Sequence, residues 1–157
     1  MKLIVSFAQT KISLSMKKIL YKGQEVEAFD LLMQKENAID ILHGNKKVET
    51  RSFSPFYFSR FIDKKKQKTS KNINDYIIRQ DVEFIHFHNY TNSWFLNVRI
   101  NESGLFVLDK ESVEIMNNDF GFHDFNNEWQ QYDDIPSSQK PMFYWFSISE
   151  IVNHNFA

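Results

Sequence analysis

Large aromatic side chains constrain the fold of this chain more than any other feature of its sequence. Phenylalanine occurs 16 times in 157 residues, and aromatic residues make up 16% of the chain. Rings of this size stabilise a fold when they pack against one another away from water, so we expect aromatic packing to dominate the interior. A chain of this length is long enough for one domain with a real core and too short for two comfortable ones. We therefore expect residues 1–157 to form a single domain.

The lack of cysteine excludes two kinds of architecture. Without a single cysteine, the chain can form neither a disulfide framework nor a thiolate zinc site. The apolar run Leu3–Ala8 is shorter than the roughly 7–15 residues of a signal-peptide core. No stretch approaches the ~18 apolar residues of a membrane span. We expect a soluble, cytoplasmic protein that has no membrane partner.

Charge is distributed unevenly along the chain, although the net charge is only −1. Residues 43–71 contain nine lysines and arginines and two acids, whereas residues 101–135 contain nine acids and one base. Such a distribution attracts anions to one part of a protein and repels them from another. The middle third of the chain is therefore expected to meet an anionic partner.

Patterns of apolar residues predict many short strands and few helices. Alternation of apolar and polar residues indicates half-buried strands, and helical spacing up to Gly44 indicates a helix that ends there. The expected strands are 3–7, 11–17, 48–53, 82–88, 93–100, 104–109 and 142–148, with turns at 92–93 and 102–104. The expected helices are 26–43, a short one that follows a turn within 55–61, and a short one that Asp124 caps and that runs to Tyr132. This order predicts an α+β fold, a small mixed sheet or barrel with two or three helices.

The segment Gly44–Arg51, with the sequence GNKKVETR, fits the pattern G-x-K-x-x-E-x-R. At this motif the chain resembles the ASCH family, whose fold is similar to that of PUA domains. Two later segments resemble the family in the same order, namely Gly121-Phe122 with Glu128-Trp129, and the expected strand at 143–148. The resemblance covers residues 36–157. It implies a small PUA-like β-barrel that binds RNA or a nucleotide.

The residues of the motif indicate a binding site even when the resemblance to the ASCH family is left aside. In a strand, Glu49 and Arg51 share one face, while Val48 takes the other and can enter the core. Lys46 precedes the strand, where its ammonium can reach the same face as Glu49. Lys46 and Arg51 would then hold a phosphate, and Glu49 would accept from the amino group of a base. The alternative is an ordinary surface ion pair of Glu49 with Arg51, beside a solvated lysine.

Two other functions follow as alternatives. One is a small nucleic-acid-processing enzyme, a nuclease or a modified-nucleoside hydrolase, with Lys46 and Glu49 as catalytic candidates. Some ASCH proteins are amidohydrolases that act on an acylated cytidine and use a threonine nucleophile. Glu49 stands at that position here and Thr50 would point the other way, which argues against that reaction. The other alternative is a protein-interaction module. No cofactor is expected, and the oligomeric state is left open.

A run of lysines is a second candidate contact for nucleic acid. Its members are Lys64, Lys65, Lys66 and Lys68. Each phosphate that such a side chain neutralises adds affinity that falls with salt. The alternative is a solvated loop without a ligand.

His86 and His88 lie two residues apart in an expected strand, so both rings project from one face. Two imidazoles in this arrangement are a candidate metal pair, with His123 or Asp124 as a third ligand. The spacing does not require a third ligand, and the alternative is a pair of polar groups on an exposed sheet face. We therefore assign no metal site.

Overall fold

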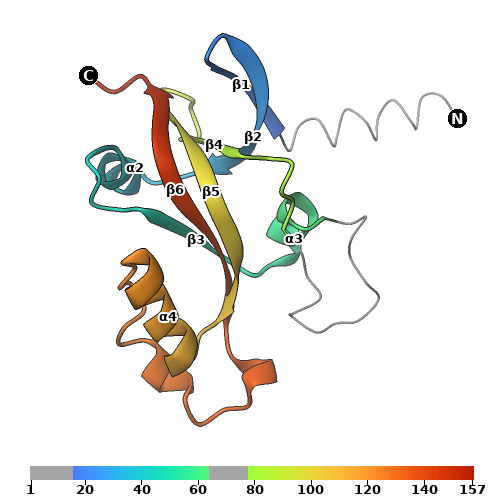
Figure 1. The fold of residues 1–157 in the computed structure, drawn as a ribbon, viewed down its shortest axis with the longest axis vertical. Helices are drawn as coiled ribbons and strands as arrows, with labels where there is room; N and C mark the ends of the chain where they lie inside the picture. The colour runs from blue at the N-terminus through green and yellow to red at the C-terminus, as the bar shows by residue number, and fades with distance from the viewer. Residues whose placement is uncertain (1–15, 64–77) are drawn as a thin grey trace, which may run out of the picture. The chain divides into compact units, whose positions relative to one another are not determined.

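The computed structural model describes residues 16–63 and 78–157, and its fold belongs to the expected α+β class (Figure 1). Six strands form one mixed sheet in the order β1-β2-β4-β5-β6-β3. The strands are β1 (Met16–Tyr21), β2 (Gln24–Leu32), β3 (Val48–Ser52), β4 (Phe84–His88), β5 (Phe95–Val107) and β6 (Met142–His154). The helices of the described residues are α2 (Lys35–Leu42), α3 (Pro55–Phe61) and α4 (Lys110–Phe120), with 3-10 turns η2 (Trp129–Tyr132) and η3 (Ser137–Gln139). Strands β2 and β4 pair in parallel, whereas β1–β2, β4–β5 and β3–β6 pair antiparallel.

The chain forms two compact units. The described part of the first unit comprises residues 16–45, 80–100 and 149–157, and that of the second comprises residues 46–63, 78–79 and 101–148. Strands β5 and β6 are 13 residues long and contribute to both units, so each unit contains part of the one sheet. No helix within the described ranges is long and apolar enough to cross a bilayer.

The first unit opens with a β-hairpin, which corrects the first half of the helix expected at 26–43. Lys22 and Gly23 have φ angles of 50° and 81°, and a tight turn between antiparallel strands requires two such left-handed residues. Strand β2 then buries the neighbouring residues Ala28 and Phe29, hence side chains on both of its faces. Because both faces are buried, the apolar residues of β2 lose strict alternation and imitate helical spacing. Only the second half of the prediction, α2, is a helix.

The strands of the first unit build two different faces. One face has an apolar centre, which consists of Phe29, Leu31, Ile85, Phe87, Leu96 and Val98, each no more than 1% exposed. The opposite face has an apolar end, where Ile19, Ala28 and Phe84 form a cluster with Tyr21, Val26 and Val152. At its other end this second face carries polar side chains, among them Asp30, His86 and Asn97.

The second unit is held together by packed aromatic rings, as the phenylalanine content predicts. The ring of Phe61 lies 5.0 Å from that of Tyr144 and 4.9 Å from that of Phe146, centroid to centroid, and all three rings are fully buried. Phe61 ends α3, which begins at Pro55 and so takes up the whole segment in which a turn and a short helix were expected. The hydroxyl of Ser54 caps this helix by accepting a hydrogen bond from its first turn. The core of the second unit thus joins α3 to strand β6.

Helix α4 was not expected, although its sequence carries signals at both ends. The carboxylate of Asp109 caps the first turn, and Gly121 ends the helix with a φ angle of 63°. Between them, Val113 and Met116 are buried three residues apart. The helix expected from Asp124 to Tyr132 is present only in its last part, because turns precede the 3-10 helix η2, which ends at Tyr132.

Some of the remaining expected elements are confirmed by the structure, and others lie outside the residues that it describes. Strands 48–53 and 82–88 correspond to β3 and β4, strands 93–100 and 104–109 join into β5, and strand 142–148 continues to His154 as β6. The strand expected at 3–7, most of 11–17 and the whole segment 64–72, which includes the lysine run, lie outside the described residues.

The turn expected at 102–104 is wrong, because β5 runs through it without interruption. A Cβ atom on Gly104 would lie only 2.7 Å from Nε1 of Trp145, and 2.9 Å from two carbons of the same ring. The glycine is therefore required by the close approach of an indole ring to the backbone, which is one use of glycine within strands. That indole also packs on Phe120 at a centroid distance of 4.5 Å, which restricts its movement.

We expect Gly104→Ala to lower the free energy of unfolding by about 1–3 kcal/mol, because the added methyl group overpacks the contact with Trp145. Urea unfolding monitored by circular dichroism measures the change. Glu102→Ala, at an exposed position of the same strand, serves as the control and should change stability by less than ~0.5 kcal/mol. Equal stabilities of the Gly104→Ala variant and the wild type would show that the indole does not need this glycine.

Candidate functional site

The motif takes the local structure that its residues predict. Gly44 follows α2 with a φ angle of 81°, and its N–H donates to the carbonyl of Ile41 at 3.1 Å, so a left-handed glycine ends the helix. The chain then enters β3 at Val48, which is 2% exposed and belongs to an apolar cluster of the second unit. Since successive side chains of a strand alternate, Glu49 and Arg51 project from the other face.

Two cationic side chains converge on the carboxylate of Glu49. The ammonium Nζ of Lys46 lies 3.8 Å from Oε1, and Nη2 of Arg51 lies 3.5 Å from Oε2. These side chains are mostly buried, with exposed fractions of 17% for Lys46, 14% for Arg51 and 7% for Glu49. Such burial does not fit the alternative of a solvated lysine beside a surface ion pair.

Tyr57 of α3 completes this group, which we call the β3 cluster (Lys46, Glu49, Arg51 and Tyr57). Nη1 of Arg51 donates to the hydroxyl of Tyr57 at 3.0 Å. The tyrosine ring is held in turn, since it stacks on Phe61 at a centroid distance of 5.3 Å and an interplanar angle of 2°. One Nη of the guanidinium therefore faces the tyrosine and the other faces the carboxylate. In this arrangement Arg51 holds Glu49 in place, and Lys46 is better placed to reach an added anion.

The two oxygens of the Glu49 carboxylate differ in their hydrogen bonds to the described residues. Oε1 accepts from the backbone N–H of Thr50 at 2.9 Å. Oε2 is buried without a hydrogen-bond partner among the described residues. A charged N–H···O bond is ~2.7–2.9 Å long, so the 3.5 Å separation from Arg51 is an ion pair only. A buried acceptor without a partner costs about 1–3 kcal/mol, and more when it is charged. An N–H or O–H group of a ligand would supply the missing bond.

His86 and His88 share one face, as predicted, with ring centroids 5.2 Å apart. Nε2 of His88 contacts the Asp30 carboxylate at 2.8 Å, and its Nδ1 contacts the backbone oxygen of Asn89 at 2.8 Å. An acceptor oxygen therefore faces each ring nitrogen of His88, so neither nitrogen is open to a metal in this arrangement. Across residues 16–63 and 78–157, no three histidine, cysteine or acidic side chains are placed to hold a metal ion.

His86 is not on an exposed sheet face, which corrects the alternative given for it, because its side chain is 8% exposed. Nδ1 of the ring lies 2.6 Å from Oδ1 of Asn97. Burial lowers the pKa of His86, and the nearby charges of His88 and Lys17 lower it further. The hydrogen bond to Oδ1 of Asn97 and the charge of Asp30 act in the opposite direction without cancelling the effect of burial on this pKa.

Some functional residues are missed by the sequence pattern, and others lie outside the structure. The hydrogen bonds of Tyr57 with Arg51 and of Asn97 with His86 were not predicted, since the partners lie on other elements, six and 11 residues away along the chain. The one local signal for Asn97 is its position between the apolar residues Leu96 and Val98. The lysine run of Lys64, Lys65, Lys66 and Lys68 lies outside the described residues.

Comparison of the chain with models of protein families, with curated proteins and with solved structures gave no match. No family is shown. The resemblance to ASCH domains therefore depends on the residues of the motif and of the two later segments, and we carry it forward as a proposal.

The lowered pKa of His86 predicts that acid destabilises the fold. An unfolded histidine takes up a proton near pH 6.5, whereas folded His86 takes it up only at lower pH. Between these two pH values the unfolded state binds more protons, so the free energy of unfolding falls as the pH falls below about 6.5. Urea unfolding at pH 7.5, 6.5 and 5.5 measures this change.

The matched control for this prediction is His86→Gln, which can still bond to Asn97 but does not titrate. Its unfolding free energy should fall less between pH 7.5 and 5.5 than that of the wild type. The same fall in both proteins would assign the acid sensitivity to other groups and contradict the role of His86.

Proposed function

We propose that this protein is an RNA- or nucleotide-binding module of the ASCH type with a PUA-like fold, and that the β3 cluster is its binding site. The observation that carries the proposal is the Glu49 carboxylate, whose side chain is 7% exposed, which lies between two cations and has one oxygen without a hydrogen bond to any described residue. A carboxylate buried in this way is costly unless a ligand completes its bonding.

Each residue of the cluster has a distinct part in the proposed site. Oε2 of Glu49 would accept from the exocyclic amino group of a base, as a glutamate does from cytosine. Lys46 would pair with a phosphate as a point charge. Arg51, which was expected to share the phosphate, would instead position the carboxylate through its contacts with Glu49 and Tyr57. The lysine run at 64–68 would add contacts to the nucleic-acid backbone.

Side-chain contacts between the first and fifth strands of the sheet order support the proposed barrel. The hydroxyl of Tyr21 on β1 donates to Glu150 on β6 at 3.0 Å, and Val152 packs in the same apolar cluster as Ile19. Strands β1 and β6 are not neighbours in the sheet, so these contacts require the sheet to curl. A sheet that curls until non-adjacent strands approach each other is an arrangement from which a small barrel can be built.

An enzyme is the second candidate, because the β3 cluster places an ammonium 3.8 Å from a buried carboxylate. A pair of this kind can act as general acid and base in a nuclease or a modified-nucleoside hydrolase. An enzyme would release a cleavage product, whereas a binding module would leave its ligand unchanged. Cleavage of RNA or of a nucleoside that Glu49→Gln abolishes, with binding retained, would favour the enzyme.

We expect the protein to bind short single-stranded RNA with an affinity that falls as salt rises, and Lys46→Ala to weaken that binding. Loss of one phosphate contact should reduce the slope of log K against log salt by about 0.7. Arg51→Ala should weaken binding about tenfold or more, because the Glu49 carboxylate loses the group that holds it. Fluorescence anisotropy between 50 and 200 mM salt measures both effects.

Lys47→Ala is the matched control for Lys46→Ala, since it removes an exposed lysine from the adjacent position. This control should bind RNA with nearly the affinity of the wild type. Circular dichroism and thermal unfolding verify that each variant is folded. If folded Lys46→Ala and Arg51→Ala variants bind as tightly as the wild type, the β3 cluster is not the site.

A further inference from the structure

Buried polar side chains mark two places in this protein. Besides tyrosine and tryptophan, the polar or charged residues buried within the described ranges are Glu49, His86 and Asn97. Glu49 belongs to the β3 cluster, but His86 and Asn97 lie together in the first unit. The proposed function uses neither of them. Because burial of polar groups is costly, and perturbed titratable groups gather at functional sites, this second place is a candidate site.

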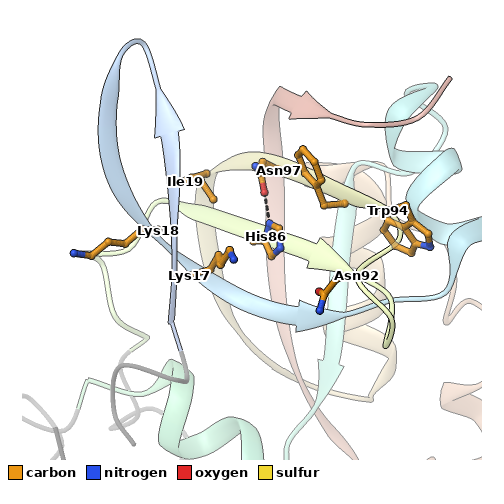
Figure 2. A pocket seen from close by; sticks show the side chains of 8 residues that line it. Lys17, Lys18, Ile19, His86, Asn92, Trp94 and Asn97 are labelled. Atoms are coloured by element: carbon orange, nitrogen blue, oxygen red, sulfur yellow. Dashed lines mark hydrogen bonds between the residues drawn. The ribbon is translucent and has the colours of Figure 1, made fainter. Parts of the chain in front are cut away.

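His86 and Asn97 line a pocket of about 330 Å³ in the first unit (Figure 2). That volume is near the lower end of the range for small-molecule sites, about 300–1,000 Å³. Trp94 and Phe95 contribute aromatic surface to the pocket, and Asn92 contributes an exposed amide. Largely apolar walls with a few polar groups are typical of sites for small organic ligands.

The pocket carries positive charge from β1. The strand register places Lys17 on the same face of the sheet as His86. In Figure 2 the side chain of Lys17 extends toward His86, whereas that of Lys18 extends away from it. None of the described residues that line the pocket is acidic, and the nearby Asp30 is paired with His88. Lys17 would therefore attract an anionic group of a ligand.

A chain of hydrogen bonds determines which ring nitrogen of His86 carries the proton. Nδ2 of Asn97 donates to Oδ1 of Asn153 at 2.6 Å, so Oδ1 of Asn97 is the atom that faces His86. This oxygen is an acceptor, and it requires the proton of the neutral imidazole to be on Nδ1. Nε2 then carries the lone pair. Nε2 is therefore an acceptor that a ligand with an N–H or O–H group can use.

The loop between β4 and β5 holds one wall of the pocket in place. Oδ1 of Asn89 accepts from the backbone N–H groups of Ser93 at 2.9 Å and Trp94 at 3.4 Å. Its Nδ2 donates to the Ser93 hydroxyl at 2.6 Å. The loop passes through Asn92, which has a left-handed φ angle of 55°. A wall that is already ordered reduces the entropy lost when a ligand binds.

We propose that this pocket binds a small planar heteroaromatic anion, up to about the size of a nucleoside monophosphate. Its ring would lie against Trp94 and Phe95. Its N–H or O–H group would donate to Nε2 of His86, and its phosphate or carboxylate would pair with Lys17. The site is separate from the β3 cluster, and its ligand does not depend on Lys46, Glu49 or Arg51.

Titration of the full chain with four probes, followed by the NMR signals of the His86 ring, tests this proposal. Uridine 5′-monophosphate supplies a ring with a phosphate, and orotate a ring with a carboxylate; uridine and inorganic phosphate each lack one part. At least one of the two anionic rings should shift the His86 Nε2 signal in a saturable way. Whichever anionic ring binds more tightly identifies the anionic group of the ligand. Uridine and phosphate should bind at least tenfold more weakly than that probe.

Lys17→Gln should weaken binding of the anionic probe about five- to tenfold, the loss expected when one charged partner is removed. Lys22→Gln, in the same hairpin but outside the pocket lining, should bind as the wild type does. Arg51→Ala should also bind as the wild type, which separates this result from the fate of the RNA proposal. The proposal is overturned if neither anionic ring shifts the His86 signals at 10 mM, the upper end of the titration, or if uridine or phosphate alone binds equally well.

Discussion

The rest of this structure depends on one constraint, which is the burial of polar groups in an aromatic interior. Moving a carboxylate or an amide out of water raises the free energy of the folded state unless hydrogen-bonding or charged partners surround it. The second unit meets this requirement for Glu49 with Lys46 and Arg51, and stacks Tyr57 on Phe61 so that its hydroxyl reaches the guanidinium. The first unit meets it with a chain of hydrogen bonds from His86 through Asn97. In both units the polar groups depend on rings and strands that hold them in place.

The bonding at these two places is incomplete, and this incompleteness is what suggests ligands. Oε2 of Glu49 has no hydrogen bond among the described residues, and Nε2 of His86 carries a lone pair beside a pocket. The two places differ in character. The β3 cluster combines opposite charges and suits a base with its phosphate, whereas the pocket combines Lys17 with aromatic walls and suits a compact anion. A fold that only needed stability would gain from apolar residues at these positions.

Features with local causes could be predicted from the sequence. The left-handed Gly44, strand β3 and the start of α3 at Pro55 each follow from neighbouring residues. The face shared by Glu49 and Arg51 follows from strand alternation, and with Lys46 adjacent, the β3 cluster was largely predictable. Helix α4 was missed although Asp109 and Gly121 mark its ends, so in that case the signal was present and not used.

Features with distant causes could not be predicted. Gly104 was interpreted as part of a turn because the reason for it is an indole 41 positions away along the chain. Strand β2 was interpreted as part of a helix because residues on both of its faces are buried, and its parallel pairing with β4, far along the chain, could not be foreseen. The partnership of His86 with Asn97 depends on the antiparallel register of β4 and β5, which places the two residues opposite each other. Pairing between strands, and not composition, determines these contacts.

The account is tested most directly by the carboxyl carbon of Glu49, because the central claim is that a ligand completes the bonding of this side chain. Its ¹³C NMR signal would be recorded with and without saturating single-stranded RNA at low salt, with the exposed Glu36 as the internal reference. The account predicts that the Glu49 signal shifts on saturation while the Glu36 signal does not. If RNA binds and the Glu49 signal stays where it was, the β3 cluster is not where the ligand is recognised.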